Sequence, residues 1–341
     1  MKLMKTEDAV GQVLCHDITQ IIKGVTKDAV FRKGHIITEE DIPVLLSVGK
    51  EHVYIWEKDD TMLHENEAAQ ILYEMCKNDF MHPSEVKEGK IELIADCDGL
   101  LKVDSQKLRK VNAFGEMMIA ARHGNTRIKK GDKLAGTRII PLVIKKDKME
   151  QAKDICKDGP ILTVKPFHKK RVGIITTGSE VFHGRIRDTF TPVIMEKLAE
   201  YGAETIYHEV FDDDPGKITK GCLTAIEQGA DLVICTGGMS VDPDDMTPLA
   251  IKNTGAEIVS YGAPVLPGAM FLLSYYKDNV PILGLPGCVM YAKRTIFDIV
   301  LPRIMADDKI SAEELASLGE GGLCLSCPVC SFPECGFGKG W

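Results

Sequence analysis

The sequence predicts an α/β protein whose largest domain is an open, mostly parallel sheet with helices on both faces. Between residues 160 and 308, short apolar segments alternate with helical ones, which is typical of parallel strands joined by crossover helices. Three of the expected helices begin at a Thr-Pro or Asp-Pro step, where the first residue caps the helix and proline fits its first turn. We expect a small mixed domain and a β-rich domain to precede this sheet.

The elements of the α/β domain are expected in a regular order. Strands are predicted at 171–177 (RVGIITT), 205–211 (TIYHEVF), 230–236 (ADLVICT) and 281–285 (PILGL). Helices are predicted after Thr191 as N-cap, after Asp214 up to about Gly229, after Thr247 as N-cap, and over the apolar residues 289–305. Each strand therefore runs into a turn that precedes a helix.

The N-terminal half is expected to hold two smaller domains. Residues 1–65 contain one helix, EEDIPVLLSVG at 39–49, between short apolar runs, and are predicted to form a small mixed α/β domain. Residues 66–150 are predicted to form a β-rich barrel or sandwich with strands at 90–96, 99–104, 115–122 and 135–144. A helical connector at 145–159 leads to the α/β domain at 160–308, and a cysteine-rich tail follows at 320–341.

Composition excludes two classes of partner. A formal net charge of -8 over 341 residues argues against a nucleic-acid binder, because phosphate backbones are held by clustered Lys and Arg. No apolar stretch has the length of a signal peptide core or a membrane span, so we expect a cytoplasmic protein that binds no membrane.

Three strand-to-helix turns are rich in glycine and hydroxyl groups: TTGSE at 176–180, TGGMSVDPDD at 236–245 and GLPG at 284–287. In an open α/β sheet such turns meet beyond the carboxyl ends of the strands, where backbone N–H groups bind anions. Any one of them alone would be an ordinary glycine-rich turn, but three together predict an anion site. The candidate binding residues are Thr176, Thr177, Gly178, Ser179, Glu180, Gly237, Gly238, Met239, Ser240, Pro286 and Gly287.

Carboxylates are concentrated in the same turns. They are Glu180, Asp188, Asp212, Asp213, Asp242, Asp244 and Asp245. Because carboxylates repel an anionic ligand unless a hard cation lies between them, Mg²⁺ is the expected companion of the anion. Asp242 and Asp245 are the preferred Mg²⁺ ligands, whereas Asp214 is expected to be only a helix cap.

Four of the eleven cysteines, Cys324, Cys327, Cys330 and Cys335, lie in the last eighteen residues with the spacing C-x2-C-x2-C-x4-C. Four thiolates suffice for a tetrahedral Zn²⁺ or for an iron-sulfur cluster, and the two remain open. The alternative is a flexible, oxidation-prone tail. Because the tail also contains Lys339 and Trp341, it is expected to dock either on a partner enzyme or on the body of the protein.

The turns together resemble the molybdopterin-binding domain of the MoeA and MogA types of molybdenum cofactor biosynthesis protein. The resemblance covers about residues 171–305, and ADLVICTGGMSVDPDDMTP is its most specific part. It implies binding of molybdopterin or its adenylylated form, with catalytic roles for Asp188, Asp242 and Asp245. It further implies molybdate as a substrate, Mg²⁺ dependence, a homo-oligomer and service to a molybdoenzyme.

Departures from the family pattern affect catalysis more than binding. The family's asparagine in GLPGNP is Cys288 here, and the asparagine after its DT step is Phe190. Cys288, at an expected helix start, is a candidate for a thiol of lowered pKa, although a buried structural cysteine is the simpler reading. Three functions stay open: Mg²⁺-dependent insertion of molybdate, non-catalytic carriage or inspection of the cofactor, and adenylylation of molybdopterin.

Overall fold

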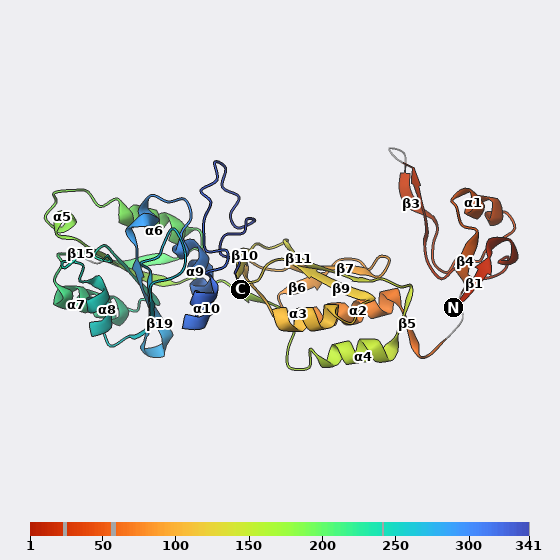
Figure 1. Ribbon diagram of the computed structural model, residues 1–341, viewed down its shortest axis with the longest axis horizontal. Coiled ribbons are helices and arrows are strands. Elements are labelled where there is room, and N and C mark those ends of the chain that lie inside the picture. Colours follow the sequence, from red (N-terminus) through yellow and green to blue (C-terminus); the bar gives the residue numbers. More distant parts are fainter. Residues whose placement is uncertain (23–25, 56–58, 241, 341) are drawn as a thin grey trace. The chain divides into compact units, whose positions relative to one another are not determined.

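The computed structural model describes residues 1–22, 26–55, 59–240 and 242–340 (Figure 1). The chain divides into two compact units. Unit 1 comprises residues 1–94, 104–122 and 133–163, and unit 2 comprises residues 95–103, 123–132 and 164–341. Within the described residues, no helix combines the length and the apolar character that crossing a membrane requires.

The first part of unit 1 is a small mixed structure. Strand β1 (Lys2–Lys5) pairs antiparallel with β4 (His52–Ile55), and β2 (Ile18–Ile22) pairs antiparallel with β3 (Thr26–Phe31). The short helices are η1 (Thr6–Asp8) and α1 (Asp41–Ser47), the latter as expected from the sequence. Leu14, Ile37, Leu45 and Val53 form a small core among them.

The second part of unit 1 contains the strands expected at 90–96, 115–122 and 135–144 together with helices, whereas the strand expected at 99–104 belongs to unit 2. A four-stranded sheet has the order β6 (Met81–Pro83), β7 (Lys90–Ala95), β11 (Lys133–Ile139), β9 (Met117–Ala121), and β5 (Met62–His64) pairs with β12 (Val143–Lys145). The expected connector forms α4 (Lys146–Asp154). Helices α2 (Glu65–Cys76) and α3 (Ser105–Asn112) were not expected.

Unit 2 is built on a six-stranded sheet. Its order is β15 (Glu204–Phe211), β14 (Arg171–Thr177), β16 (Leu232–Thr236), β19 (Val280–Leu285), β18 (Leu272–Tyr276), β17 (Glu257–Tyr261). The first four strands are parallel, and β18 pairs antiparallel with both of its neighbours, β19 and β17. The expectation of an open, mostly parallel sheet is therefore confirmed, although β17 and β18 were not foreseen.

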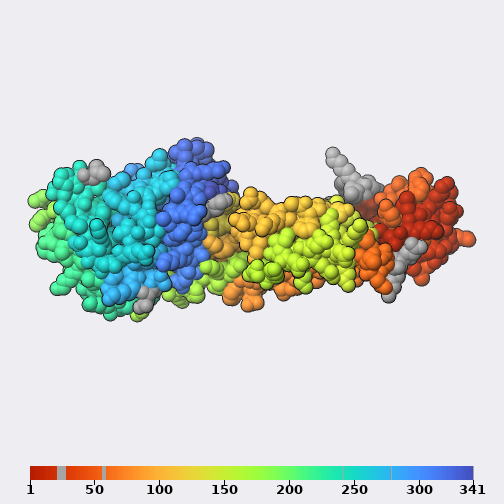
Figure 2. All heavy atoms as spheres, turned by 60° about the horizontal axis from the view of Figure 1, so that its bottom comes forward, coloured from red at the N-terminus to blue at the C-terminus, as the bar shows by residue number. Residues whose placement is uncertain are grey.

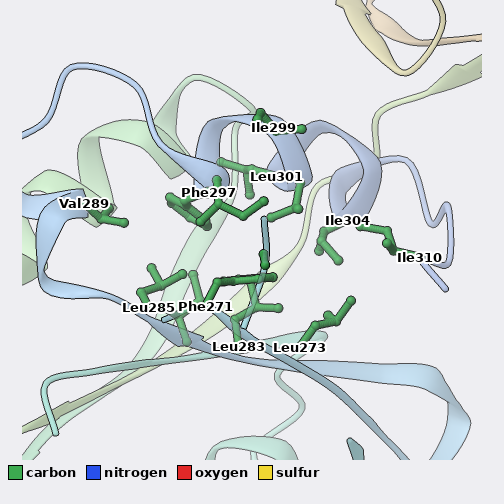
Figure 3. Packing of buried hydrophobic residues seen from close by; sticks show 14 of the residues in the cluster. Phe271, Leu273, Leu283, Leu285, Val289, Phe297, Ile299, Leu301, Ile304 and Ile310 are labelled. Carbon is green, nitrogen blue, oxygen red and sulfur yellow. The ribbon is translucent and has the colours of Figure 1, made fainter. Parts of the chain in front are cut away.

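Helices cover both faces of this sheet. On one face, side chains such as Val233 and Ile282 pack with those of α7 (Pro215–Glu227) and α8 (Thr247–Asn253). On the other, Leu283 and its neighbours pack with α6 (Phe190–Ala199) and α9 (Ile296–Met305), as Figure 3 shows for Phe297 and Leu301. Neighbouring residues of a strand point to opposite faces, so these strands are apolar throughout.

Three expected helix starts differ from the structure. The Asp214 cap is confirmed, because its carboxylate accepts hydrogen bonds from the N–H groups of Gly216 and Lys217. Thr191 and Thr247 are not caps: both lie inside their helices, and their hydroxyl groups bind side chains of β14. The prediction of one continuous helix over residues 289–305 is also wrong. A turn of 3-10 helix, η3 (Gly287–Met290), precedes α9, which Thr295 caps.

The remaining elements complete unit 2. A three-stranded sheet joins β10 (Thr126–Ile128), β8 (Gly99–Val103) and β13 (Leu162–Pro166), and the short helices are α5 (Ser179–Phe182), η2 (Lys277–Asn279) and α10 (Ala312–Ser317).

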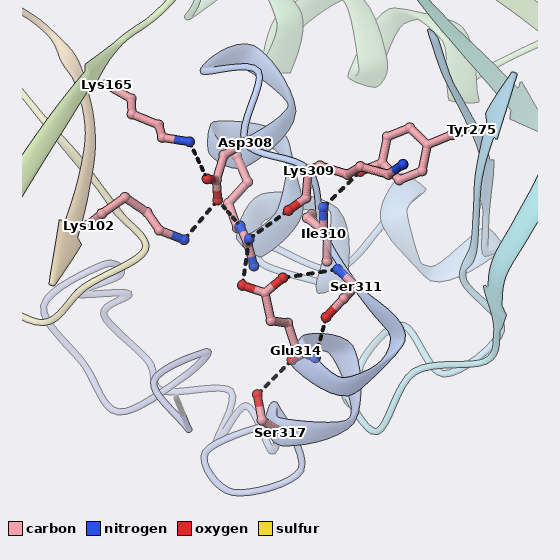
Figure 4. Close-up of polar contacts among 10 residues, drawn as sticks. Lys102, Lys165, Tyr275, Asp308, Lys309, Ile310, Ser311, Glu314 and Ser317 are labelled. Carbon is pink, nitrogen blue, oxygen red and sulfur yellow. Dashed lines mark hydrogen bonds and ion pairs between the residues drawn. The ribbon is translucent and has the colours of Figure 1, made fainter. Parts of the chain in front are cut away.

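At the end of α9, the buried Arg303 and Asp308 form an ion-pair cluster with Lys102, Lys165 and Glu314 (Figure 4). The C-terminal segment, the darkest blue in Figure 2, lies on the surface of unit 2.

Candidate functional site

The ends of β14, β16 and β19 bring the three glycine-rich turns to one edge of the sheet. The three strands are adjacent and parallel, with Thr176 opposite Thr236 and Thr236 opposite Leu285. Because each turn continues from one of these strand ends, TTGSE, TGGMSVDPDD and GLPG share the carboxyl edge, where an open α/β sheet binds its ligands. Val241, within the second turn, lies outside the described residues.

The first and second turns touch at Gly237 and Gly238. Both glycines have positive φ, +84° and +54°. A Cβ atom on Gly237 would lie 2.1 Å from the carbonyl oxygen of Thr177, and one on Gly238 would lie 2.8 Å from the Thr247 hydroxyl oxygen. Only glycine combines this backbone conformation with so close an approach, so the sequence fixes the shape of the junction here.

The second turn also contacts the third strand. Met239 is buried against Gly284 of β19, where a Cβ atom would come within 2.6 Å of the methionine sulfur. From β17, the Tyr261 hydroxyl donates a hydrogen bond of 3.0 Å to the carbonyl oxygen of Met239. The second turn is thus held from both sides, which leaves Ser240 exposed beyond it.

The threonine hydroxyls of β14 support the turns from within. Thr177 is buried, donates to the carbonyl oxygen of Thr236 at 3.2 Å, and hydrogen-bonds the Thr247 hydroxyl at 3.1 Å. Thr176 is buried and bonds the Thr191 hydroxyl at 2.9 Å. Thr176 and Thr177 therefore position the edge, and the groups left open to a ligand are the half-buried Ser179, the exposed Ser240 and the exposed Gly287. Pro286 is buried behind Gly287.

Two of the candidate carboxylates, Asp188 and Asp213, accept hydrogen bonds from backbone N–H groups near the first turn. Asp188 accepts from the N–H groups of Phe190 and Thr191 at 2.8 and 3.1 Å, which caps α6. Burial raises the pKa of Asp188, but hydrogen bonds from Thr191 and Phe190 outweigh it and lower the pKa. Asp213 accepts from the N–H group of Ser179 at 2.9 Å, and so ties the first turn to the β15–α7 connection.

The carboxylates of the second turn are more open. Asp242 and Asp244 are exposed, and Asp245 is half-buried. The N–H group of Asp242 donates to the Asp245 carboxylate at 3.2 Å, and the N–H group of Asp245 donates to the Asp242 carbonyl oxygen at 2.9 Å. Glu180 is exposed, and its carboxylate lies over Gly178, which is itself buried.

His208 of β15 is a candidate that sequence reasoning missed. Its Nε2 atom lies 3.2 Å from the Thr176 hydroxyl, 3.3 Å from the Thr191 hydroxyl and 3.9 Å from the Asp188 carboxylate. A single histidine in a strand carries no motif, and only the pairing of β15 with β14 brings it to these groups.

The cysteines differ in their surroundings. Burial raises the pKa of the Cys288 thiol, so the expectation of a lowered pKa there is wrong. Cys324, Cys327, Cys330 and Cys335 all line one hollow of about 550 Å³. Across the described part of the chain, no three His, Cys, Asp or Glu side chains converge closely enough to hold a single metal ion.

Unit 2 is thus an α/β domain in which parallel strand ends, glycine turns and carboxylates meet at the edge where the sequence predicts an anion site. A family model described as "probable molybdopterin binding domain" matches residues 173–306, and a domain of unknown function matches residues 3–57. The matched residues, 173–306, are thus similar to a molybdopterin-binding domain, which confirms the resemblance to that domain expected from the sequence.

Curated relatives match over a short part of the chain. A CinA-like protein of Mycobacterium tuberculosis is 37% identical over 90 residues, which is 26% of this chain and 21% of that protein. A putative competence-damage inducible protein of Bacillus velezensis is 36% identical over 85 residues, 25% of this chain and 20% of that protein. The match thus spans about a fifth of the length of these relatives.

Solved structures with related sequences include two MoaB proteins. The molybdopterin biosynthesis enzyme MoaB of Thermus thermophilus is 26% identical, with 39% of this chain and 91% of that chain covered and a TM-score of 0.32. The tungsten cofactor synthesizing protein MoaB of Pyrococcus furiosus is 20% identical, with 42% and 98% covered and a TM-score of 0.34.

Proposed function

We propose that unit 2 binds the phosphorylated pterin of the molybdenum cofactor at the edge formed by the three turns, and that the chain serves the biosynthesis or handling of this cofactor. The observation that carries the proposal is the junction at Gly237 and Gly238, two glycines of positive φ that have no side chain to cover their backbone N–H groups, at the edge where the three turns meet. The open groups of Ser179, Ser240 and Gly287 border the same edge. A phosphate there would meet donors from all three turns.

The metal expected beside that phosphate is Mg²⁺, with Asp242 and Asp245 as its ligands. Their oxygens are the hard donors that Mg²⁺ prefers, and both belong to the turn that continues from β16. Bound there, Mg²⁺ would neutralise phosphate charge and polarise a phosphoryl oxygen. Asp188, which caps α6, would instead keep the segment before that helix in place.

The activity that we propose first is insertion of molybdate into adenylylated molybdopterin. We propose that the chain carries out this reaction in the cytoplasm as a homo-oligomer and that the product is supplied to a molybdoenzyme. Carriage of the cofactor without catalysis is the second candidate. It is favoured by Phe190, which stands where the family has asparagine and is buried in the core of unit 2, where it offers no polar group to a ligand. The Pro243–Asp244 step keeps adenylylation as a third candidate.

Anaerobic incubation of the full chain with adenylylated molybdopterin, molybdate and Mg²⁺ separates these functions. Mass spectrometry of the pterin should show a molybdenum-containing product if the chain inserts molybdate. Tight pterin binding without any product would favour the carrier, and adenylylation of molybdopterin from ATP would favour the third function. If the chain binds no pterin in any of these assays, the proposal that it binds the cofactor is refuted.

The Mg²⁺ assignment makes a prediction about two substitutions. Asp242→Asn and Asp245→Asn should each raise the Mg²⁺ concentration required for half-maximal pterin binding or turnover about tenfold, because each removes one anionic ligand. Asparagine keeps the oxygen that accepts the hydrogen bond within the turn, so the fold of the turn should persist. Asp244→Asn, in the same turn, is the matched control. If all three variants require the same Mg²⁺ concentration, Asp242 and Asp245 are not the Mg²⁺ ligands.

A further inference from the structure

The cysteine-bearing tail is closely packed on unit 2. Phe337 is 5% exposed and belongs to the main hydrophobic core. A Cβ atom on Gly322 would lie 2.2 Å from the carbonyl oxygen of Pro264, and one on Gly338 would lie 2.8 Å from a side-chain carbon of Ile299. Such contacts require glycine, so the path of the tail is specified by its sequence. The sequence left two docking sites open for the tail, a partner enzyme and the body of the protein. In the structure the tail packs on the body of the protein.

Backbone hydrogen bonds fix the first cysteine in this arrangement. The N–H group of Leu266 donates to the carbonyl oxygen of Gly322 at 2.8 Å, and the N–H group of Cys324 donates to the carbonyl oxygen of Leu266 at 2.8 Å. Cys324 and Cys335 are partly buried against the core, whereas Cys327 and Cys330 are exposed. The tail therefore presents two anchored and two open thiols.

All four thiols line one hollow. Its volume is about 550 Å³, and its wall is completed by residues 291–294 of the loop that follows the GLPG turn and by the aromatic rings of Phe332 and Phe337. A single tetrahedral Zn²⁺ needs four sulfur atoms within about 2.3 Å of one point. No three potential ligands converge in this way in the described residues. Among the described residues, the four cysteines therefore share one hollow without being gathered around a single point.

We propose that Cys324, Cys327, Cys330 and Cys335 hold a [4Fe–4S] iron-sulfur cluster in this hollow. A [4Fe–4S] cluster takes four cysteine thiolates, one per iron, and thus needs the sulfur atoms spread around a cavity and not gathered at a point. The first three cysteines have the C-x2-C-x2-C spacing of bacterial ferredoxin ligands. This site is separate from the proposed pterin edge and does not depend on it.

Cationic side chains complement the charge of such a cluster. Arg294 and Lys293 both line the hollow. The Arg294 guanidinium lies 5.3 Å from the centre of the Phe332 ring and hydrogen-bonds the Asp298 carboxylate at 2.9 Å. Hydrogen bonds to cluster sulfurs and nearby charge tune the reduction potential. Arg294 is thus positioned to stabilise the more negative, reduced state.

Metal and sulfide analysis of the full chain, purified without oxygen, tests the proposal. We expect about four iron and four acid-labile sulfide per chain, with visible absorption that dithionite bleaches. If the isolated protein lacks iron, anaerobic incubation with Fe²⁺, sulfide and thiol should restore the same stoichiometry. Stoichiometric zinc without iron, or no bound metal after this reconstitution, would overturn the cluster.

Substitutions assign the ligands. Cys327→Ser and Cys330→Ser should each lower the iron content at least severalfold, and because both side chains are exposed, neither should unfold the protein. Cys97→Ser, at a half-buried cysteine outside the tail, is the matched control and should retain full iron. Unchanged iron in both tail variants would contradict the assignment. Pterin binding measured on the same samples distinguishes failure of this site from failure of the proposed function.

Discussion

Replacing Asp308 with asparagine should lower the free energy of unfolding of unit 2 by about 3 kcal/mol, because it removes the carboxylate shared by the buried Arg303 and by Lys165 and Lys102 and leaves Arg303 paired with the Glu314 carboxylate. The Asp308 carboxylate accepts from Arg303 Nε at 2.6 Å, from Lys165 at 2.6 Å and from Lys102 at 2.9 Å (Figure 4). The side chain of Arg303 is 1% exposed and that of Asp308 is 7% exposed. Solvent cannot replace the missing charge at such depth.

Asp307→Asn provides the control for this variant. Asp307 is the adjacent residue, its side chain is 60% exposed, and its φ of +51° is one that asparagine tolerates. Its carboxylate is open to solvent, although its partner Lys170 is only 9% exposed, so Asp307→Asn should destabilise unit 2 less than Asp308→Asn does. Urea unfolding of the full chain, with hydrogen exchange of α9 as a local measure, should separate the two variants. Equal destabilisation would show that Arg303 does not depend on Asp308.

The same cluster predicts a pH dependence. Burial raises the pKa of Asp308, but Arg303, Lys165 and Lys102 outweigh it and lower the pKa to about 2, from an ordinary value of 3.8. A depressed pKa in the folded state stabilises the fold above pH 3.8, and this contribution is lost as the pH falls through about 2. Its size is about 2 kcal/mol. In Asp308→Asn, acid titration between these values should change the stability of α9 less than it does in the unmodified protein, with Glu314 accounting for part of what remains.

Sequence patterns predicted the sheet better than its surroundings. The strands at 171–177 and 230–236 are continuous apolar runs followed by glycine turns, and such runs are distinctive of buried parallel strands. Helix α3 was missed because it buries only Val111 and so has no apolar stripe. Helix α2 does bury an apolar stripe that includes Leu72 and Met75, and only the expectation of a β-rich domain obscured it.

Tertiary hydrogen bonds account for the other differences. Thr191 and Thr247 precede prolines and therefore look like caps, but their hydroxyl groups turn inward to Thr176 and Thr177, a pairing that depends on how helices pack on the sheet. His208 joins the first of these pairs for the same reason. The domain boundaries, the site residues and the tail ligands rest on sequence motifs, and they stay predictions that the experiments above test.

Replacing Gly237 with alanine should weaken pterin binding roughly a hundredfold, because a shift of about 1 Å in a binding group can cost that much. The new Cβ atom would lie 2.1 Å from the Thr177 carbonyl oxygen, and this atom belongs to backbone that cannot rotate away. Either the first or the second turn must move. Both border the proposed phosphate, so neither displacement leaves the anion site intact.

Two other glycines calibrate this effect. Gly255→Ala has a similar φ of +83° but open space around it, so it should cost only about 1 kcal/mol of stability and leave pterin affinity unchanged. Gly238→Ala, where the nearest atom is a side-chain hydroxyl oxygen at 2.8 Å, should fall between the two. Pterin fluorescence titrations without oxygen, with circular dichroism to verify folding, would measure the series. Equal pterin affinity of the folded Gly237→Ala and Gly255→Ala proteins would place the phosphate elsewhere, because a ligand held at this junction must respond to its distortion.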